Sequence, residues 1–104
     1  MYVILTSKPG KFHTELAAAL SVVESYEYHF YGKIKAVFQI AILDGETKVR
    51  VVEDEPPYVV NDVPSKFLEK FASLEDARKE LNYLTSFGSM DASLVPCSNA
   101  QVAG

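Results

Sequence analysis

The chain has 104 residues, 48% of them hydrophobic, and a formal net charge of −4 at pH 7. This length is typical of one domain with one core, and the composition excludes a disordered or low-complexity chain. The ten lysines and arginines are dispersed from Lys8 to Lys79 without a basic run, so we expect no nucleic-acid partner.

The apolar segments are too short for a membrane. Met1 to Thr6 is followed at once by Lys8, Pro9 and Gly10, and no stretch approaches the roughly 20 apolar residues that a membrane span requires. The sequence therefore predicts no membrane partner, and the cytoplasm is the expected compartment. Cys97 is the single cysteine and cannot form an intrachain disulfide.

The first predicted element is a strand, Tyr2 to Thr6, because β-branched and aromatic residues dominate it. Proline and glycine within Lys8 to Gly10 favour a turn after it. The next segment, Phe12 to Leu20, places apolar residues at helical spacing but is short and rich in alanine. We interpret it as a short helix or an ordered loop.

Three alternating segments follow: Ser21 to Phe30, Ile34 to Leu43, and Thr47 to Val52. Asp44-Gly45 is a strong hairpin signal, since both residues tolerate positive φ. It predicts that the second and third segments pair, with Phe38 opposite Val51.

The connection between the first two segments fixes a second predicted register. A three-residue loop, Tyr31 to Lys33, pairs Tyr26 with Phe38 and Tyr28 with Ala36, which brings the apolar parities of both segments to one face.

The C-terminal half supplies the cover for that face. Pro56 and Pro57 end the third segment, the chain runs extended to Pro64, and a short helical turn is predicted from Pro64 to Phe71. Ser73 begins the clearest helix, which has an apolar stripe of Leu74, Ala77, Leu81 and Leu84 and ends before Gly88. A last strand is predicted from Ser89 to Val95.

These elements define an α+β fold with the order β, weak helix or loop, β, β, β, α, α, β. An antiparallel sheet of about four to five strands has one face covered by the C-terminal amphipathic helix. Residues 1–96 are predicted to form a single α+β domain, and residues 97–104 are predicted to form a flexible C-terminal tail.

The opposite sheet face is predicted to be mixed, with an apolar centre and a basic rim, as docking surfaces are. Its members are Val37, Val52, Ala41, Lys35, Lys48 and Arg50. Two readings without a partner stay open: scattered exposed aliphatic side chains, or cover by the N-terminal segment.

No catalytic, metal or cofactor signature emerges. Two histidines and one cysteine without ligand spacing predict neither a metal nor a cofactor. The weak catalytic candidates are His29 and Glu27, which share a strand face. Aromatic side chains are interpreted as core and not as a base-stacking platform.

The leading hypothesis is a small non-catalytic interaction or accessory module of a cytoplasmic assembly, which binds a protein partner or a second copy through the exposed sheet face. The alternative is a small enzyme or ligand-binding domain with its site near the 53–62 loop, which contains Tyr58 and Asn61.

Overall fold

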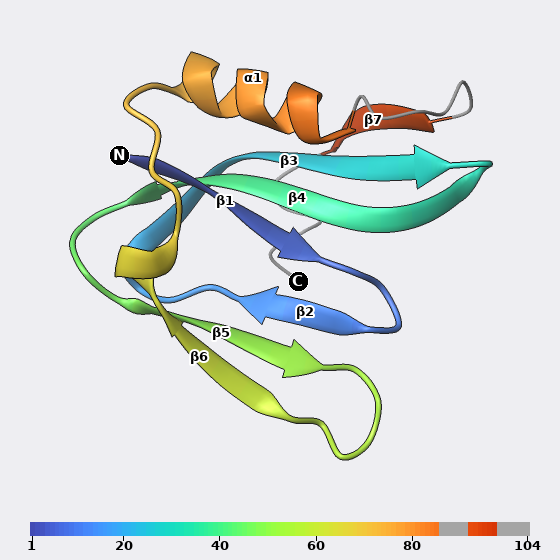
Figure 1. The fold of residues 1–104 in the computed structure, drawn as a ribbon, viewed down its shortest axis with the longest axis horizontal. Helices are drawn as coiled ribbons and strands as arrows, with labels where there is room; N and C mark the ends of the chain where they lie inside the picture. The colour runs from blue at the N-terminus through green and yellow to red at the C-terminus, as the bar shows by residue number, and fades with distance from the viewer. Residues whose placement is uncertain (86–91, 98–104) are drawn as a thin grey trace.

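The computed structural model describes residues 1–85 and 92–97. Over these ranges the chain forms two antiparallel sheets and a helix (Figure 1). The four-stranded sheet has the order β1 (Tyr2–Ser7), β4 (Lys33–Leu43), β3 (Leu20–Phe30), β7 (Ala92–Cys97). The three-stranded sheet has the order β2 (Phe12–Glu15), β5 (Lys48–Glu53), β6 (Val60–Pro64). The predicted α+β class is confirmed, and the second sheet was not expected.

The elements stack in three layers (Figure 1). Helix α1 (Leu74–Thr85) covers one face of the four-stranded sheet, and the three-stranded sheet lies across the other. The cluster under the helix contains Ile40, Ala77 and Leu81, and partly buried Phe38 and Tyr26 pack against it. The cluster between the sheets consists of Val3, Leu5, Leu20, Ala41, Leu43 and Val49. The central part of β4, at Ile40 and Ala41, is therefore buried on both faces.

The predicted hairpin at Asp44-Gly45 is wrong. β4 pairs with β1 and β3, whereas β5 pairs with β2 and β6. Gly45 does adopt a positive φ of 85°, but Asp44 does not, so the predicted two-residue hairpin turn with positive φ at both positions is wrong as well. The turn carries the chain from one sheet to the other, because both edges of β4 already have partners.

The predicted register between β3 and β4 is confirmed in its central part, where Tyr26 pairs with Phe38 and Tyr28 with Ala36. The three-residue loop is wrong, since Phe30 pairs with Lys33 across Tyr31 and Gly32. Both loop residues have positive φ, 52° and 75°, as a two-residue hairpin turn requires. The shorter loop shifts the pairing beside the turn by one residue, and a β-bulge between Ile34 and Ala36 restores the predicted register beyond it. Lys35 therefore has no direct partner on β3.

The segment from Phe12 to Leu20 contains a strand and no helix, so that interpretation is wrong in its helical form. β2 alternates, with Phe12 and Thr14 partly buried and His13 and Glu15 exposed. The predicted turn before it is present: the Lys11 amide donates to the Lys8 carbonyl at 2.9 Å, and Gly10 has a φ of 79°.

The predicted main helix is confirmed as α1, and the Ser73 hydroxyl caps it by accepting a bond from the Asp76 amide at 3.1 Å. Leu84 is 48% exposed and does not belong to the buried stripe. The predicted helical turn from Pro64 to Phe71 is reduced to a 3-10 helix, Ser65–Phe67. None of the helices in the described ranges is long and apolar enough to cross a membrane.

The last strand lies further along the chain than predicted, and Cys97, assigned to the tail, is the final residue of β7. Gly88, the first residues of the predicted strand and residues 98–104 lie outside the described residues.

Candidate functional site

The residues of the predicted docking face do not form one surface. Val37 lies on β4 and pairs with Ser7 and Glu27, whereas Val52 lies on β5 and pairs with His13 and Val60. Ala41 is fully buried between the two sheets. The predicted face required β4 to pair with β5. Because that pairing does not occur, its residues lie in two different sheets.

The remaining members are basic, and they fall into two places. Lys48 and Arg50 lie on β5, and Arg50 forms an ion pair with Asp62 of β6, with Nε 3.0 Å from Oδ1. This hydrogen bond lowers the pKa of the Asp62 carboxyl. Lys35 lies on the bulge of β4, at the other end of the molecule's sheets.

The weak catalytic candidates do touch. His29 Nε2 lies 3.1 Å from Glu27 Oε1, and both side chains are partly exposed. Neither residue lines either of the two cavities described below. Burial raises the pKa of the neighbouring Cys97 thiol, and Glu27 adds to that effect, so this thiol is not activated as a nucleophile.

The loop proposed for the alternative site is a hairpin between β5 and β6. Its turn closes with the Tyr58 amide donating to the Glu55 carbonyl at 2.9 Å. Tyr58 is 57% exposed at this turn, and Asn61 lies on β6 opposite Val51. Neither Tyr58 nor Asn61 lines either of the two cavities described below.

An acid–base pair that sequence reasoning missed lies on the outer side of this sheet. His13 Nδ1 is 2.7 Å from Asp54 Oδ1, and His13 Nε2 is 3.5 Å from Glu15 Oε2. The bond to Asp54 raises the pKa of His13. No sequence signal links these residues, because they meet only through the pairing of β2 with β5. Among the described residues no group of histidine, cysteine and carboxylate side chains is arranged to hold a metal.

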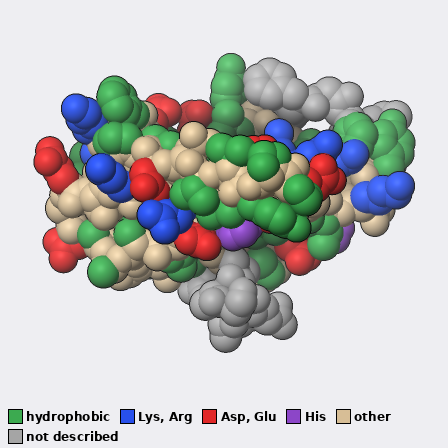
Figure 2. Space-filling view, turned by 90° about the horizontal axis from the view of Figure 1, so that it is seen from below, with side chains coloured by type: hydrophobic (Ala, Val, Ile, Leu, Met, Phe, Trp, Pro, Cys, Tyr) green, Lys and Arg blue, Asp and Glu red, His purple; other side chains and the backbone are tan. Residues whose placement is uncertain are grey.

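Viewed from the side of the three-stranded sheet, hydrophobic side chains gather in the middle, and lysine and arginine side chains lie at both ends (Figure 2). Exposed Tyr58, Val59 and Val60 contribute to the hydrophobic surface of this sheet.

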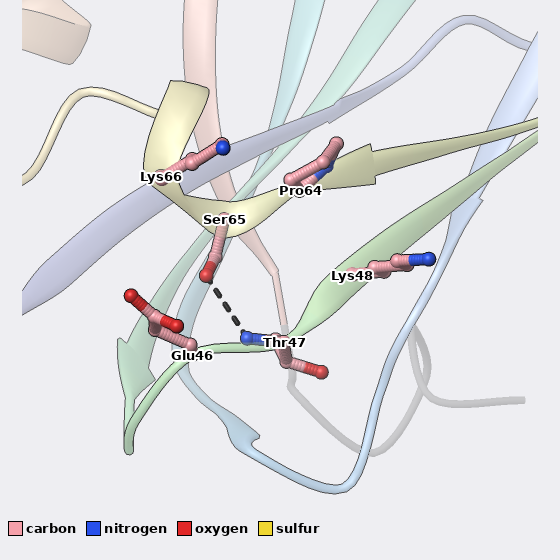
Figure 3. Close-up of a pocket in the computed structure, with 6 residues that line it drawn as sticks. All are labelled: Glu46, Thr47, Lys48, Pro64, Ser65 and Lys66. Carbon is pink, nitrogen blue, oxygen red and sulfur yellow. Dashed lines mark hydrogen bonds between the residues drawn. The ribbon is translucent and has the colours of Figure 1, made fainter.

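One cavity of about 390 Å³ lies where β5 begins and β6 ends (Figure 3). Its central polar groups bond to each other, since the Thr47 amide donates to Ser65 Oγ at 3.0 Å and the Ser65 amide to the Thr47 carbonyl at 2.7 Å. The side chains of Glu46 and Lys48 lie on opposite sides of this bond (Figure 3). The cavity therefore has mixed charge, with its central donors and acceptors already satisfied.

A second cavity, of about 490 Å³, differs in its charge. It is lined by Lys8, Pro9, Lys11, Tyr28, Lys33, Ile34, Lys35, Ala36 and Phe38, and we call it the lysine groove. Four of the ten basic side chains of the protein line it, and no acidic one does. The groove thus carries positive charge on a protein whose net charge is −4.

The four lysines of the groove are exposed. Among the residues that the structure describes, none of these ammonium groups forms an ion pair with a carboxylate within 4.0 Å. A concave surface of one charge sign attracts ions of the opposite sign and raises their local concentration. Its apolar floor is provided by Tyr28 and Phe38, whose ring centroids are 6.4 Å apart.

The fold itself brings these lysines together. Lys8 and Lys11 belong to the turn after β1, and Lys33 and Lys35 begin β4; antiparallel pairing of β1 with β4 places both segments at the same end of the sheet. In the sequence the lysines appear singly dispersed. The spacings Lys-x-x-Lys after β1 and Lys-x-Lys at the start of β4 are the sequence features that could have indicated the groove. They indicate it only once β1 is known to pair with β4.

Comparison with known proteins adds no relative: no family model, no curated protein and no solved structure matches the chain.

Proposed function

We propose that this chain is a non-catalytic interaction module of a cytoplasmic protein assembly, and that it binds an acidic segment of a partner protein in the lysine groove. The observation that carries the proposal is the set of four exposed lysines around one groove of about 490 Å³, none of which forms an ion pair within the part of the chain that the structure describes. Because the whole chain is acidic, this local cluster is unlike the rest of its composition.

The groove also offers apolar contact. Ile34 is 41% exposed beside the lysines, and Tyr28 and Phe38 form the floor. A partner segment that combines carboxylates with aliphatic side chains would satisfy both kinds of surface. Single-stranded nucleic acid fits less well, because stacking needs open ring faces and both rings are partly buried and tilted by 58° to one another.

The test is fluorescence anisotropy with a labelled peptide of ten alternating glutamate and valine residues. We expect binding at low ionic strength that weakens steeply as salt is added, since exposed charge pairs are screened. Each exposed pair contributes about 0.2–1 kcal/mol. Reversing two lysines, Lys33→Glu with Lys35→Glu, removes two such attractions and adds two repulsions of similar size, so it should weaken binding about fourfold or more.

The matched control reverses two exposed lysines outside the groove, Lys66→Glu with Lys79→Glu, which changes the net charge equally. The control should bind within about twofold of the unmodified chain. Equal loss in both variants would reveal general charge attraction and contradict the proposed site.

Two further probes identify other occupants. If ten-residue oligouridylate binds more tightly than the peptide, the ligand of the groove is nucleic acid and the proposed acidic segment is wrong. If the chain self-associates in sedimentation, and Lys33→Glu with Lys35→Glu abolishes this association, the partner of the groove is a second copy of the chain.

A further inference from the structure

β4 is longer than the strand that pairs with one of its edges. It runs from Lys33 to Leu43, and β1 pairs only with Val37 to Ile42. Among the described residues, the first four residues of β4, Lys33 to Ala36, have no partner on the β1 side. On the other side Lys33, Ile34 and Ala36 pair with β3, and Lys35 lies at the bulge. A strand edge of this kind presents backbone N–H and C=O groups that can pair with another chain.

β1 cannot extend over this free edge, because the turn that follows it is held in place. The Lys8 amide donates to the Phe12 carbonyl at 2.9 Å, and the Phe12 amide donates to the Lys8 carbonyl at 3.0 Å. The Asp54 amide of the second sheet donates to the Lys11 carbonyl at 2.9 Å. The turn thus bends away from β4, and the lysine groove lies between the two.

Lysines on an exposed edge also protect it from pairing with a second copy of the same edge, because like charges would meet. Here the same side chains favour a strand of opposite charge. A lysine-rich free edge is therefore selective: it repels its own copy and admits an acidic segment.

We infer that the acidic partner segment binds as an added β-strand, antiparallel to β4 along Lys33 to Ala36, in the line that β1 leaves at Ser7. This inference rests on the proposed function and specifies its binding mode. Four residues of free edge span about 13 Å at about 3.3 Å per residue. Main-chain hydrogen bonds hold the segment, and its alternate side chains meet the lysines or the apolar floor.

Backbone N-methylation of the peptide tests whether it binds as an added β-strand. In an edge strand the N–H groups of alternate residues face the sheet, and the others face solvent. Two versions of the glutamate–valine peptide, N-methylated at the odd or at the even residues, have equal charge and equal numbers of methyl groups. We expect one version to lose affinity about tenfold and the other to stay within about threefold of the parent peptide.

The outcomes separate the two proposals. If the parent peptide binds in a manner that depends on Lys33 and Lys35, and both methylated versions bind alike, strand addition is wrong while the acidic groove remains. If the parent peptide does not bind at all, the proposed function fails. Hydrogen exchange gives a second readout, since amides within Lys33 to Ala36 should exchange more slowly with the parent peptide bound.

Discussion

Arg78 of α1 donates two hydrogen bonds to the carboxylate of Glu24 on β3, and Tyr26 donates a third to the same carboxylate. This group links the helix to β3 of the four-stranded sheet, and the helix itself has only Ala77 and Leu81 fully buried. Glu24 also follows the bulge at Val23 on β3, so the carboxylate is placed by an irregularity in the ladder.

Acid should weaken this link. The hydrogen bonds from Arg78 hold the pKa of the Glu24 carboxyl below its ordinary value of 4.5. A group whose pKa is lowered by folding stabilises the folded state above its unfolded pKa, and the stabilisation is lost as pH falls through the folded pKa. We expect Glu24→Gln to be destabilised relative to the unmodified chain at pH 7, with a difference that shrinks below pH about 4.

Urea unfolding at a series of pH values measures this difference. The control is Glu69→Gln, which removes an exposed carboxylate for which no ion pair is found among the described residues. A constant difference between Glu24→Gln and the unmodified chain from pH 7 to pH 3 would contradict the predicted linkage.

The second pH prediction has the opposite sign. Asp54 raises the pKa of His13 above 6.5, so the pair stabilises the fold below that pH and the effect is lost as pH rises through the folded pKa. Asp54→Asn should lower the midpoint of the His13 ring titration followed by NMR. Asp62→Asn removes an equal charge that is paired with Arg50, and it should leave the midpoint nearly unchanged. Equal shifts in both variants would show that the effect is not specific to Asp54.

The sequence predicted those features of the fold that depend on residues close together in the chain, and it did not predict the pairing of strands far apart in the chain. The pairing of Tyr26 with Phe38 and the capping of α1 by Ser73 follow from local alternation and local hydrogen bonding, and both were found. The partners of β5 lie in β2 and β6, and no local signal selects them over β4.

One signal for the second sheet was present in β4. Alternate residues on one face of this strand include Phe38 and Ile40, and the residues on the opposite face, which include Val37 and Ala41, are apolar as well. A strand with two apolar faces is buried on both, and this pattern requires a covering layer on each side. The mixed face is predicted to be a docking surface, but its residue Ala41 lies in the core between the two sheets, so the predicted site does not form one surface.

The burial of β4 predicts a sharp contrast between two isoleucines on one strand face. Ile40 is completely buried beneath Ala77 and Leu81, whereas Ile42, two residues further, is 38% exposed. Ile40→Ala should cost about 2–5 kcal/mol of unfolding free energy, because it leaves a cavity, and Ile42→Ala should cost less than half as much. Chemical denaturation of both variants measures the contrast, and equal losses would place the helix over a different part of the sheet.

Gly45 offers a test of why a glycine is needed between the sheets. Its φ is 85°, yet a Cβ at this position would meet nothing within 4 Å, so the cost of a side chain comes from the backbone conformation and not from a clash. Gly45→Ala should therefore destabilise the fold by about 1 kcal/mol, since L-residues disfavour positive φ. Asparagine tolerates this region better than alanine, and Gly45→Asn should lose clearly less. Urea melts of the two variants beside the unmodified chain distinguish the causes: equal losses for alanine and asparagine would mean that the φ angle is not what this connection requires.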